Sequence, residues 1–181
     1  MKISTWNVNS VNARIEHLEK FIKKDQSDIY LLQELKTIED GFPKEIIKDA
    51  GYYSYVNGQK AWNGVAILSK KKLEITNTSI PTYDDPNARF IETEIQLKKI
   101  KKNIKLINIY LPNGNPIETE KFDYKIKWMK KFNSYIQGLK NNNIPIIISG
   151  DFNVIPTDDD VYSPENFKND ACTHPLTREH Y

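Results

Sequence analysis

The chain of 181 residues contains one cysteine, Cys172, and no apolar run long enough to cross a bilayer. One cysteine cannot form an internal disulfide, and it is compatible with a reducing compartment. A membrane-spanning helix needs about 18 or more apolar residues in succession, so no contact with a membrane is expected. The N-terminus has the pattern of a strand rather than that of a signal peptide. These absences predict a cytoplasmic protein.

The glycine patterns of nucleotide-binding loops, G-x-G-x-x-G and G-x-x-x-x-G-K-S/T, are also absent, which argues against a nucleotide-binding α/β protein. There is no internal repeat, low-complexity segment or linker, so we expect a single domain over residues 1–181. The net charge of +2 does not by itself predict nucleic-acid binding. Lysines gather at 70–72, 98–105 and 127–131, where they could neutralise phosphates or simply lie on solvated faces.

The strand and helix patterns are interleaved along the chain. Apolar residues at helical spacing predict helices over 11–22 and 118–139. A proline near the start and a glycine just past the end predict a short helix over 43–50. Strand patterns cover 52–56, 64–69, 73–77 and 89–95, and a hairpin through 98–103 leads into a strand over 106–111. This order predicts an α/β (α+β) fold: a two-sheet mixed β-sandwich flanked by helices.

The isoleucine-rich run Ile144–Ile148 predicts a strand buried on both faces. We expect Gly150 to end this strand, with Asp151 and Asn153 following it. Open α/β folds place their ligands at the carboxyl ends of strands. The alternative is a plain turn, because Gly, Asp and Asn are ordinary turn residues.

Three further strand patterns, over 2–9, 29–32 and 106–111, end in comparable polar side chains. A polar residue at one strand end is usually only the exit to solvent, but four such ends together suggest one shared rim. Carboxylates suit Mg²⁺, which usually takes one or two of them from the protein. A tyrosine hydroxyl can donate to a phosphate oxygen. The residues that we predict to converge on one cleft are Asn7, Glu34, Tyr110, Asp151 and Asn153.

Several motifs resemble those of the exonuclease III family, bacterial apurinic/apyrimidinic endonucleases within the endonuclease/exonuclease/phosphatase superfamily. They are Trp-Asn-Val-Asn-Ser from position 6, Leu-Leu-Gln-Glu-Leu-Lys from 31, Gly-Gln-Lys from 58 with Gly-Val-Ala from 64, Tyr-Leu-Pro-Asn-Gly-Asn-Pro from 110, and Gly-Asp-Phe-Asn-Val-Ile-Pro-Thr-Asp from 150. Gln-Glu and Gly-Asp-x-Asn indicate the superfamily. The Gly-Gln-Lys and Tyr-Leu-Pro-Asn-Gly blocks narrow the resemblance to its DNA-repair branch.

The resemblance implies a DNase I-like fold and a Mg²⁺-dependent nuclease, with Mn²⁺ as a possible substitute. Its partner would be duplex DNA with abasic sites or 3′ ends, and the protein would be a bacterial, nucleoid-associated monomer. The metal ligands would be Asn7, Glu34, Asp151 and Asn153. The catalytic residues would be Tyr110, Asp151 and Asn153. The DNA contacts would be Lys36, Arg89 and Asn113, with Lys36 also orienting a metal-site carboxylate.

The family's closing Ser-Asp-His motif and its tryptophan-lined abasic pocket have no counterpart in these 181 residues. We therefore expect the domain to be incomplete at its C-terminal end, and this form to cleave DNA weakly or not at all. Two alternatives stay open. One is a truncated, non-catalytic remnant that binds DNA or metal, and the other is a superfamily phosphatase or a nuclease of other specificity.

Overall fold

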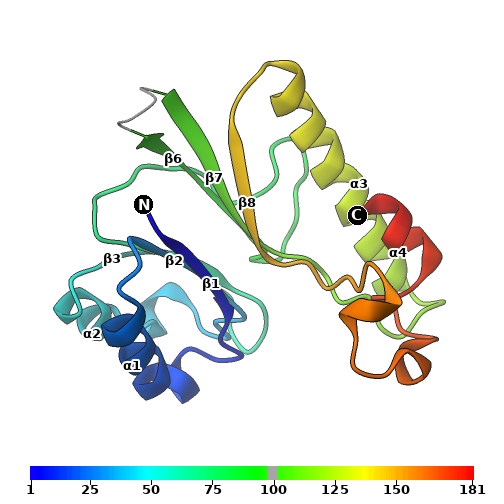
Figure 1. Cartoon of the computed structure of the whole chain (residues 1–181), viewed down its shortest axis with the longest axis horizontal. Helices are drawn as coiled ribbons and strands as arrows, with labels where there is room; N and C mark the ends of the chain where they lie inside the picture. The colour runs from blue at the N-terminus through cyan, green and yellow to red at the C-terminus, as the bar shows by residue number, and fades with distance from the viewer. Residues whose placement is uncertain (98–101) are drawn as a thin grey trace. The chain divides into compact units, whose positions relative to one another are not determined.

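The structure is a computed structural model that describes residues 1–97 and 102–181 (Figure 1). The chain divides into two compact units. The first unit comprises Met1–Tyr110 with Asn143–Asp151, and the second comprises Leu111–Asn142 with Phe152–Tyr181. In the described residues, no helix is long and apolar enough to cross a membrane.

The first unit contains two four-stranded sheets. Sheet A has the order β1 (Ile3–Asn7), β2 (Ile29–Gln33), β4 (Val65–Ser69), β3 (Tyr53–Asn57). Sheet B has the order β5 (Ile75–Asn77), β6 (Phe90–Leu97), β7 (Lys102–Tyr110), β8 (Ile146–Asp151). The pairs β1–β2 and β7–β8 are parallel, and all other neighbours are antiparallel. The predicted mixed two-sheet architecture is therefore confirmed.

Strands β6 and β7 form an antiparallel pair, as the hairpin predicted through 98–103 requires, and most of its turn falls outside the residues that the structure describes. Residues 98–101, which include most lysines of the predicted 98–105 cluster, lie outside the described residues.

Two apolar layers hold the first unit together. Alternate residues of a strand face opposite sides of a sheet, so Tyr30 of β2 packs in the layer beneath the helices, whereas Leu31 packs in the layer facing sheet B. The helices are α1 (Ile15–Asp25) and α2 (Lys44–Asp49), which Figure 1 shows on the face of sheet A away from sheet B. Sheet B contributes Leu106 and its apolar neighbours to the second layer. The first unit is thus a sandwich with helices on one outer face.

A buried polar bridge crosses between the two sheets. Asn108 of β7 is fully buried, and its amide nitrogen donates to the carbonyls of Leu32 and Ala66, both at 2.9 Å. The side chain of Gln33 donates in turn to the Asn108 oxygen at 2.7 Å. Sequence reasoning did not identify this bridge. Its two members adjoin residues of the predicted cleft: Gln33 directly precedes Glu34, and Asn108 lies two residues before Tyr110.

Strand β8 differs from its prediction in two ways. It lies at the edge of sheet B and its residues are half-buried, so the prediction of a strand buried on both faces is wrong. The strand also continues through Gly150 to Asp151. Gly150 has a φ of 142°, and a Cβ there would lie 2.0 Å from the carbonyl oxygen of Ile109. The glycine therefore permits a close approach to β7 rather than ending the strand.

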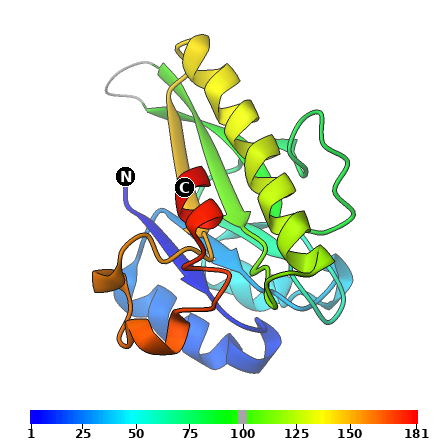
Figure 2. The same ribbon diagram turned by 90° about the vertical axis from the view of Figure 1, so that its right-hand side faces the viewer.

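The second unit is built on the helices α3 (Glu120–Asn141) and α4 (Pro175–His180), which lie side by side (Figures 1 and 2). Asn133 of α3 donates to the carbonyl of His180 at 2.7 Å, and the rings of Phe122 and His174 are 4.5 Å apart. The apolar stripe predicted for the long helix is buried: Phe122, Ile126, Met129, Phe132 and Ile136.

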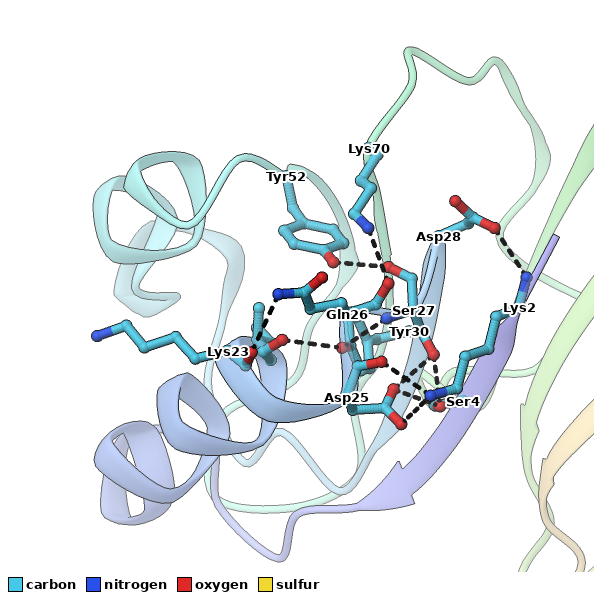
Figure 3. Close-up of polar contacts among 11 residues, drawn as sticks. Lys2, Ser4, Lys23, Asp25, Gln26, Ser27, Asp28, Tyr30, Tyr52 and Lys70 are labelled. Carbon is cyan, nitrogen blue, oxygen red and sulfur yellow. Dashed lines mark hydrogen bonds and ion pairs between the residues drawn. The ribbon is translucent and has the colours of Figure 1, made fainter.

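A second polar cluster joins the end of α1 to the start of β1 (Figure 3). The carboxylate of Asp25 accepts hydrogen bonds from the Lys2 ammonium at 2.5 Å and from the hydroxyls of Ser4 and Ser27 at 2.9 and 2.5 Å. The hydroxyl of Tyr52 donates to the Ser27 carbonyl at 2.6 Å. This cluster lies at the strand ends opposite to those that carry Asn7 and Glu34.

Candidate active site at the carboxyl ends of four strands

Four strands of the first unit end in the side chains that the sequence indicated. In sheet A, β1 ends at Asn7, and β2 ends immediately before Glu34. In sheet B, β7 ends at Tyr110 and β8 at Asp151, and these two residues are paired across the parallel ladder. Each sheet therefore contributes two adjacent carboxyl ends, because parallel strands in register finish at the same edge.

The amide of Asn7 joins the two carboxylates at the centre of the site. Its nitrogen donates to Glu34 Oε1 at 3.0 Å and to Asp151 Oδ2 at 2.7 Å. Two oxygens bonded to one nitrogen can be no more than about 6 Å apart. The oxygen of Asn7 accepts from the backbone N–H of Asn9 at 3.0 Å, which turns the amide nitrogen toward the carboxylates. The predicted convergence is thus observed for these three side chains.

Tyr110 completes the cluster from β7. Its hydroxyl donates to Glu34 Oε1 at 2.8 Å. Burial raises the pKa of Tyr110, and the neighbouring Glu34 carboxylate raises this pKa further. The phenol is therefore a persistent hydrogen-bond donor rather than a source of phenolate.

Glu34 is held in its ionised form. Burial by itself raises the pKa of this carboxyl, but the hydrogen bonds from Asn7, Tyr110 and Lys36 outweigh burial and leave the pKa below its usual value. The ammonium of Lys36 lies 3.2 Å from Glu34 Oε2 and also donates to the side chain of Asn9. Lys36 is thus paired with Glu34, and its orienting of a metal-site carboxylate and its contact with DNA both stay predictions.

The backbone that carries Glu34 is unusual. Glu34 and Lys36 have φ values of 55° and 56°, in the left-handed region that side chains other than glycine rarely adopt. Between them, the N–H of Leu35 bonds to the carbonyl of Gly64 at 3.2 Å, and the N–H of Lys36 bonds to that of Asn63 at 3.0 Å. Such conformations persist where the surroundings over-determine them. The loop before β4 therefore helps to hold Glu34 in place.

Arg89 contacts Tyr110 in this structure. Its Nη1 donates to the Tyr110 carbonyl at 3.1 Å, and its guanidinium carbon lies 4.9 Å from the centre of the Tyr110 ring. This geometry allows a cation–π interaction. Arg89 thereby restrains the ring whose hydroxyl reaches Glu34, and its contact with DNA stays a prediction.

Asn113 and Asn153 belong to the second unit, where they lie together. The amide nitrogen of Asn113 donates to the side-chain oxygen of Asn153 at 3.3 Å, and the amide nitrogen of Asn153 donates to the carbonyl of Leu111 at 2.8 Å. The convergence of Asn153 on the cleft, and the binding roles assigned to both asparagines, stay predictions.

The donor set of Glu34 and Asp151 fits an oxygen-preferring divalent cation. The two carboxylates lie within reach of one amide nitrogen, and the pKa of Glu34 is below its usual value. The residues that the structure describes contain no group of three His, Cys, Asp or Glu side chains that could hold a metal. Mg²⁺ commonly takes only one or two protein carboxylates and keeps several waters, so a pair of carboxylates is enough for it.

The chain belongs to the Endonuclease/Exonuclease/phosphatase family, whose sequence profile matches residues 4–180. Within it, the chain is similar to exodeoxyribonuclease III of Haemophilus influenzae, with 35% identity over 167 residues. This similarity covers 89% of the chain and 60% of that enzyme, so the chain spans less than two thirds of this relative's length.

Two solved structures have the same fold. One is an AP endonuclease from Archaeoglobus fulgidus, with a TM-score of 0.89 and 32% identity, covering 100% of this chain and 68% of that one. The other is a 3′ phosphatase from Neisseria bound to a product DNA hairpin, with a TM-score of 0.88 and 32% identity, covering 99% and 68%. The DNase I-like fold and the resemblance to this nuclease family are therefore confirmed.

Proposed function

We propose that this protein is a Mg²⁺-dependent nuclease that hydrolyses phosphodiester bonds at abasic sites and 3′ ends of duplex DNA. The observation that carries the proposal is the Asn7 amide shared by Glu34 and Asp151 at the meeting point of two sheets. The similarity to exodeoxyribonuclease III and to an AP endonuclease supports the choice of substrate. Mn²⁺ is the expected substitute metal.

Glu34 and Asp151 would hold the metal through their carboxylate oxygens, with Asn7 beside them. When bound, a divalent cation neutralises phosphate charge and favours the ionisation of an attacking water. Asp151 would handle the proton of the nucleophile or of the leaving oxygen. Lys36 pairs with the other carboxylate, Glu34, at 3.2 Å. We therefore assign the proton transfer to Asp151 rather than to Glu34.

The hydrogen-bond donors of the site would orient the phosphate. Tyr110 keeps its proton because its pKa is raised, so its hydroxyl can bond to a phosphate oxygen in place of Glu34. Asn153 would hold the scissile phosphate, and Arg89 and Asn113 would contact the DNA backbone. We further propose that the protein acts as a monomer in the bacterial cytoplasm, on the DNA of the nucleoid.

The test is single-turnover incision of an abasic duplex, with enzyme in excess because these 181 residues are expected to cleave weakly. We expect incision that requires Mg²⁺, is abolished by a chelator, and falls about 10²- to 10⁴-fold in Asp151→Asn, because loss of a general acid or base typically costs that much. Glu34→Gln should lose both incision and calorimetric Mg²⁺ binding. Glu39→Gln is the matched control, since Glu39 is exposed and pairs with Lys44.

The alternatives predict different results in the same assay. Removal of a 3′-phosphate without incision at an abasic site would identify a phosphatase, the activity named for the Neisseria relative. Binding of DNA or Mg²⁺ without any hydrolysis would identify a non-catalytic protein. Incision that is equally fast in wild type, Glu34→Gln and Glu39→Gln would contradict the proposed site.

A further inference from the structure

Lys125, in the second turn of α3, is a fully buried cation. Its ammonium donates to the backbone carbonyls of Asn113, Asn153 and Ala171, at 3.0, 2.6 and 3.3 Å. An ammonium group has three N–H donors, so three carbonyls match its capacity. These bonds offset the cost of removing the charge from water.

The three carbonyls come from three separate segments of the second unit. They lie 12, 28 and 46 residues from Lys125 along the chain, after β7, after β8 and before α4. Two of the three belong to Asn113 and Asn153, whose side chains also bond to each other at 3.3 Å. One ammonium group is therefore bonded to the backbones of two residues, Asn153, the predicted phosphate contact, and Asn113, the predicted DNA contact.

The aliphatic part of Lys125 shapes the same loop. Gly114 has a φ of 88°, and a Cβ there would lie 2.6 Å from Lys125 Cδ and 3.1 Å from Lys125 Cβ. The loop backbone thus packs directly against the lysine stem, at a position where only glycine fits without strain. Both ends of the Lys125 side chain determine the path of the residues that follow β7.

Lys125 and Leu111 hold Asn153 at both its backbone and its side chain. Its φ of 46° is in the left-handed region, which asparagine adopts more often than most side chains do. Its carbonyl is bound by Lys125, and its side-chain nitrogen is bound to the carbonyl of Leu111 at 2.8 Å. Loss of the Lys125 ammonium would therefore free the backbone of Asn153 on one side.

We infer that Lys125 is a positioning residue, whose ammonium fixes the backbones of Asn113 and Asn153 and so directs their amide side chains toward a phosphate of the DNA. The inference rests on the function proposed above for these two asparagines. An apolar side chain of the same length would fill the space without the cost of burying a charge. It would also leave the three carbonyls, of which that of Ala171 is buried, without this donor.

The first arm of the test is chemical rescue of incision. We expect Lys125→Ala to lower single-turnover incision of the abasic duplex by about 100-fold, the loss that a misplacement of about 1 Å can cause. Ethylammonium, which can enter the vacated space and donate three hydrogen bonds, should restore most of it. Tetramethylammonium at equal ionic strength has no N–H donor and should restore none. Lys140→Ala, which changes an exposed lysine of the same helix, is the matched control and should respond to neither amine.

The second arm does not depend on activity. In amide nuclear magnetic resonance spectra, Lys125→Ala should shift or broaden the backbone and side-chain signals of Asn113 and Asn153, and ethylammonium should return them to the wild-type positions. The signals of Asn7 should stay unchanged. Lys125→Met, which keeps the volume without the charge, guards against loss of folding in the alanine variant. It should show the same perturbation without rescue.

The two arms separate failure of this inference from failure of the proposed function. If Glu34→Gln incises as fast as wild type, the proposed function fails, and the spectra alone decide for or against Lys125. The inference is overturned if wild-type signals of Asn113 and Asn153 persist in Lys125→Met. It is also overturned if tetramethylammonium rescues as well as ethylammonium, since a charge or packing effect would then account for the loss.

Discussion

At the scale of single residues, Asn7 links the two carboxylates of the candidate site. Its amide nitrogen carries two N–H groups and donates to both Glu34 and Asp151. Lys36 adds a positive charge on the other oxygen of Glu34, at 3.2 Å.

The protonation state of Tyr110 gives a prediction at the same scale. Because burial and the Glu34 carboxylate raise its pKa, the phenol should not ionise near pH 10, where an ordinary tyrosine does. We predict that Tyr110→Phe leaves the ultraviolet titration of tyrosines between about pH 9 and 11 unchanged, yet lowers incision by about 100-fold. Loss of a group that titrates near pH 10 in this variant would show that Tyr110 is not buried against Glu34.

At the scale of elements, the position of Asp151 depends on how closely β8 approaches β7. This approach is possible only because residue 150 has no side chain: a Cβ would lie 2.0 Å from the Ile109 carbonyl oxygen. The parallel register that pairs Asp151 with Tyr110 includes this contact. Gly150, which has no functional group of its own, thus determines how close Asp151 lies to Tyr110.

We predict that Gly150→Ala destabilises the protein by about 3 kcal/mol, because the added methyl group clashes with backbone and the φ of 142° is unfavourable for alanine. The measurement is equilibrium unfolding in urea. Gly138→Ala is the matched control: Gly138 lies within α3 with open space around its Cα, and alanine should stabilise the helix there by about 0.5–1 kcal/mol. Equal effects of the two substitutions would contradict the close approach of β8.

At the scale of the whole molecule, acid stability should depend on the cluster around Asp25 (Figure 3). The hydrogen bond from the Lys2 ammonium, followed by those from Ser27 and Ser4, holds the pKa of Asp25 well below its usual range. A carboxylate of this kind stabilises the folded state above its unfolded pKa of about 3.9. This stabilisation is lost as the pH falls through the lower pKa of the folded state.

Asp25→Asn should therefore lower the thermal midpoint at pH 7, and the difference from wild type should shrink below about pH 4. Thermal unfolding followed by circular dichroism over a series of pH values measures this difference. Asp49→Asn changes an exposed aspartate of α2 and is the control. A difference that stays constant down to strongly acidic pH would mean that Asp25 acts through packing rather than through its charge.

Local sequence patterns predicted the elements and most of the strand ends, because burial and the alternation of side chains along a strand determine which residue types occur at neighbouring positions. The strand over 29–32 and the apolar stripe of α3 were predicted in this way. The place of β8 at a sheet edge was not, since a run of isoleucines has the same pattern in an edge strand and in a central one. Gly150 was misread for a related reason: a glycine that ends a strand and one that permits close approach look alike in sequence.

The geometry between elements was also beyond reach of the sequence. The Gln33–Asn108 bridge joins residues far apart in the chain, and only the two folded sheets bring them together. The burial of Lys125 against three carbonyls is hidden for the same reason, because a lysine in an amphipathic helix is usually solvated. The expectation that these 181 residues cleave DNA weakly stays a prediction.

The Gln33–Asn108 bridge has a consequence for how the protein tolerates change. Apolar layers are non-directional, so two sheets held by isoleucine and leucine alone could slide past each other by a fraction of a residue whenever the layer is repacked. Hydrogen bonds are directional, and those of Asn108 to Leu32 and Ala66 fix the translational alignment of the sheets. We therefore expect the hydroxyl of Tyr110 to stay in register with Glu34 when apolar residues between the sheets are substituted.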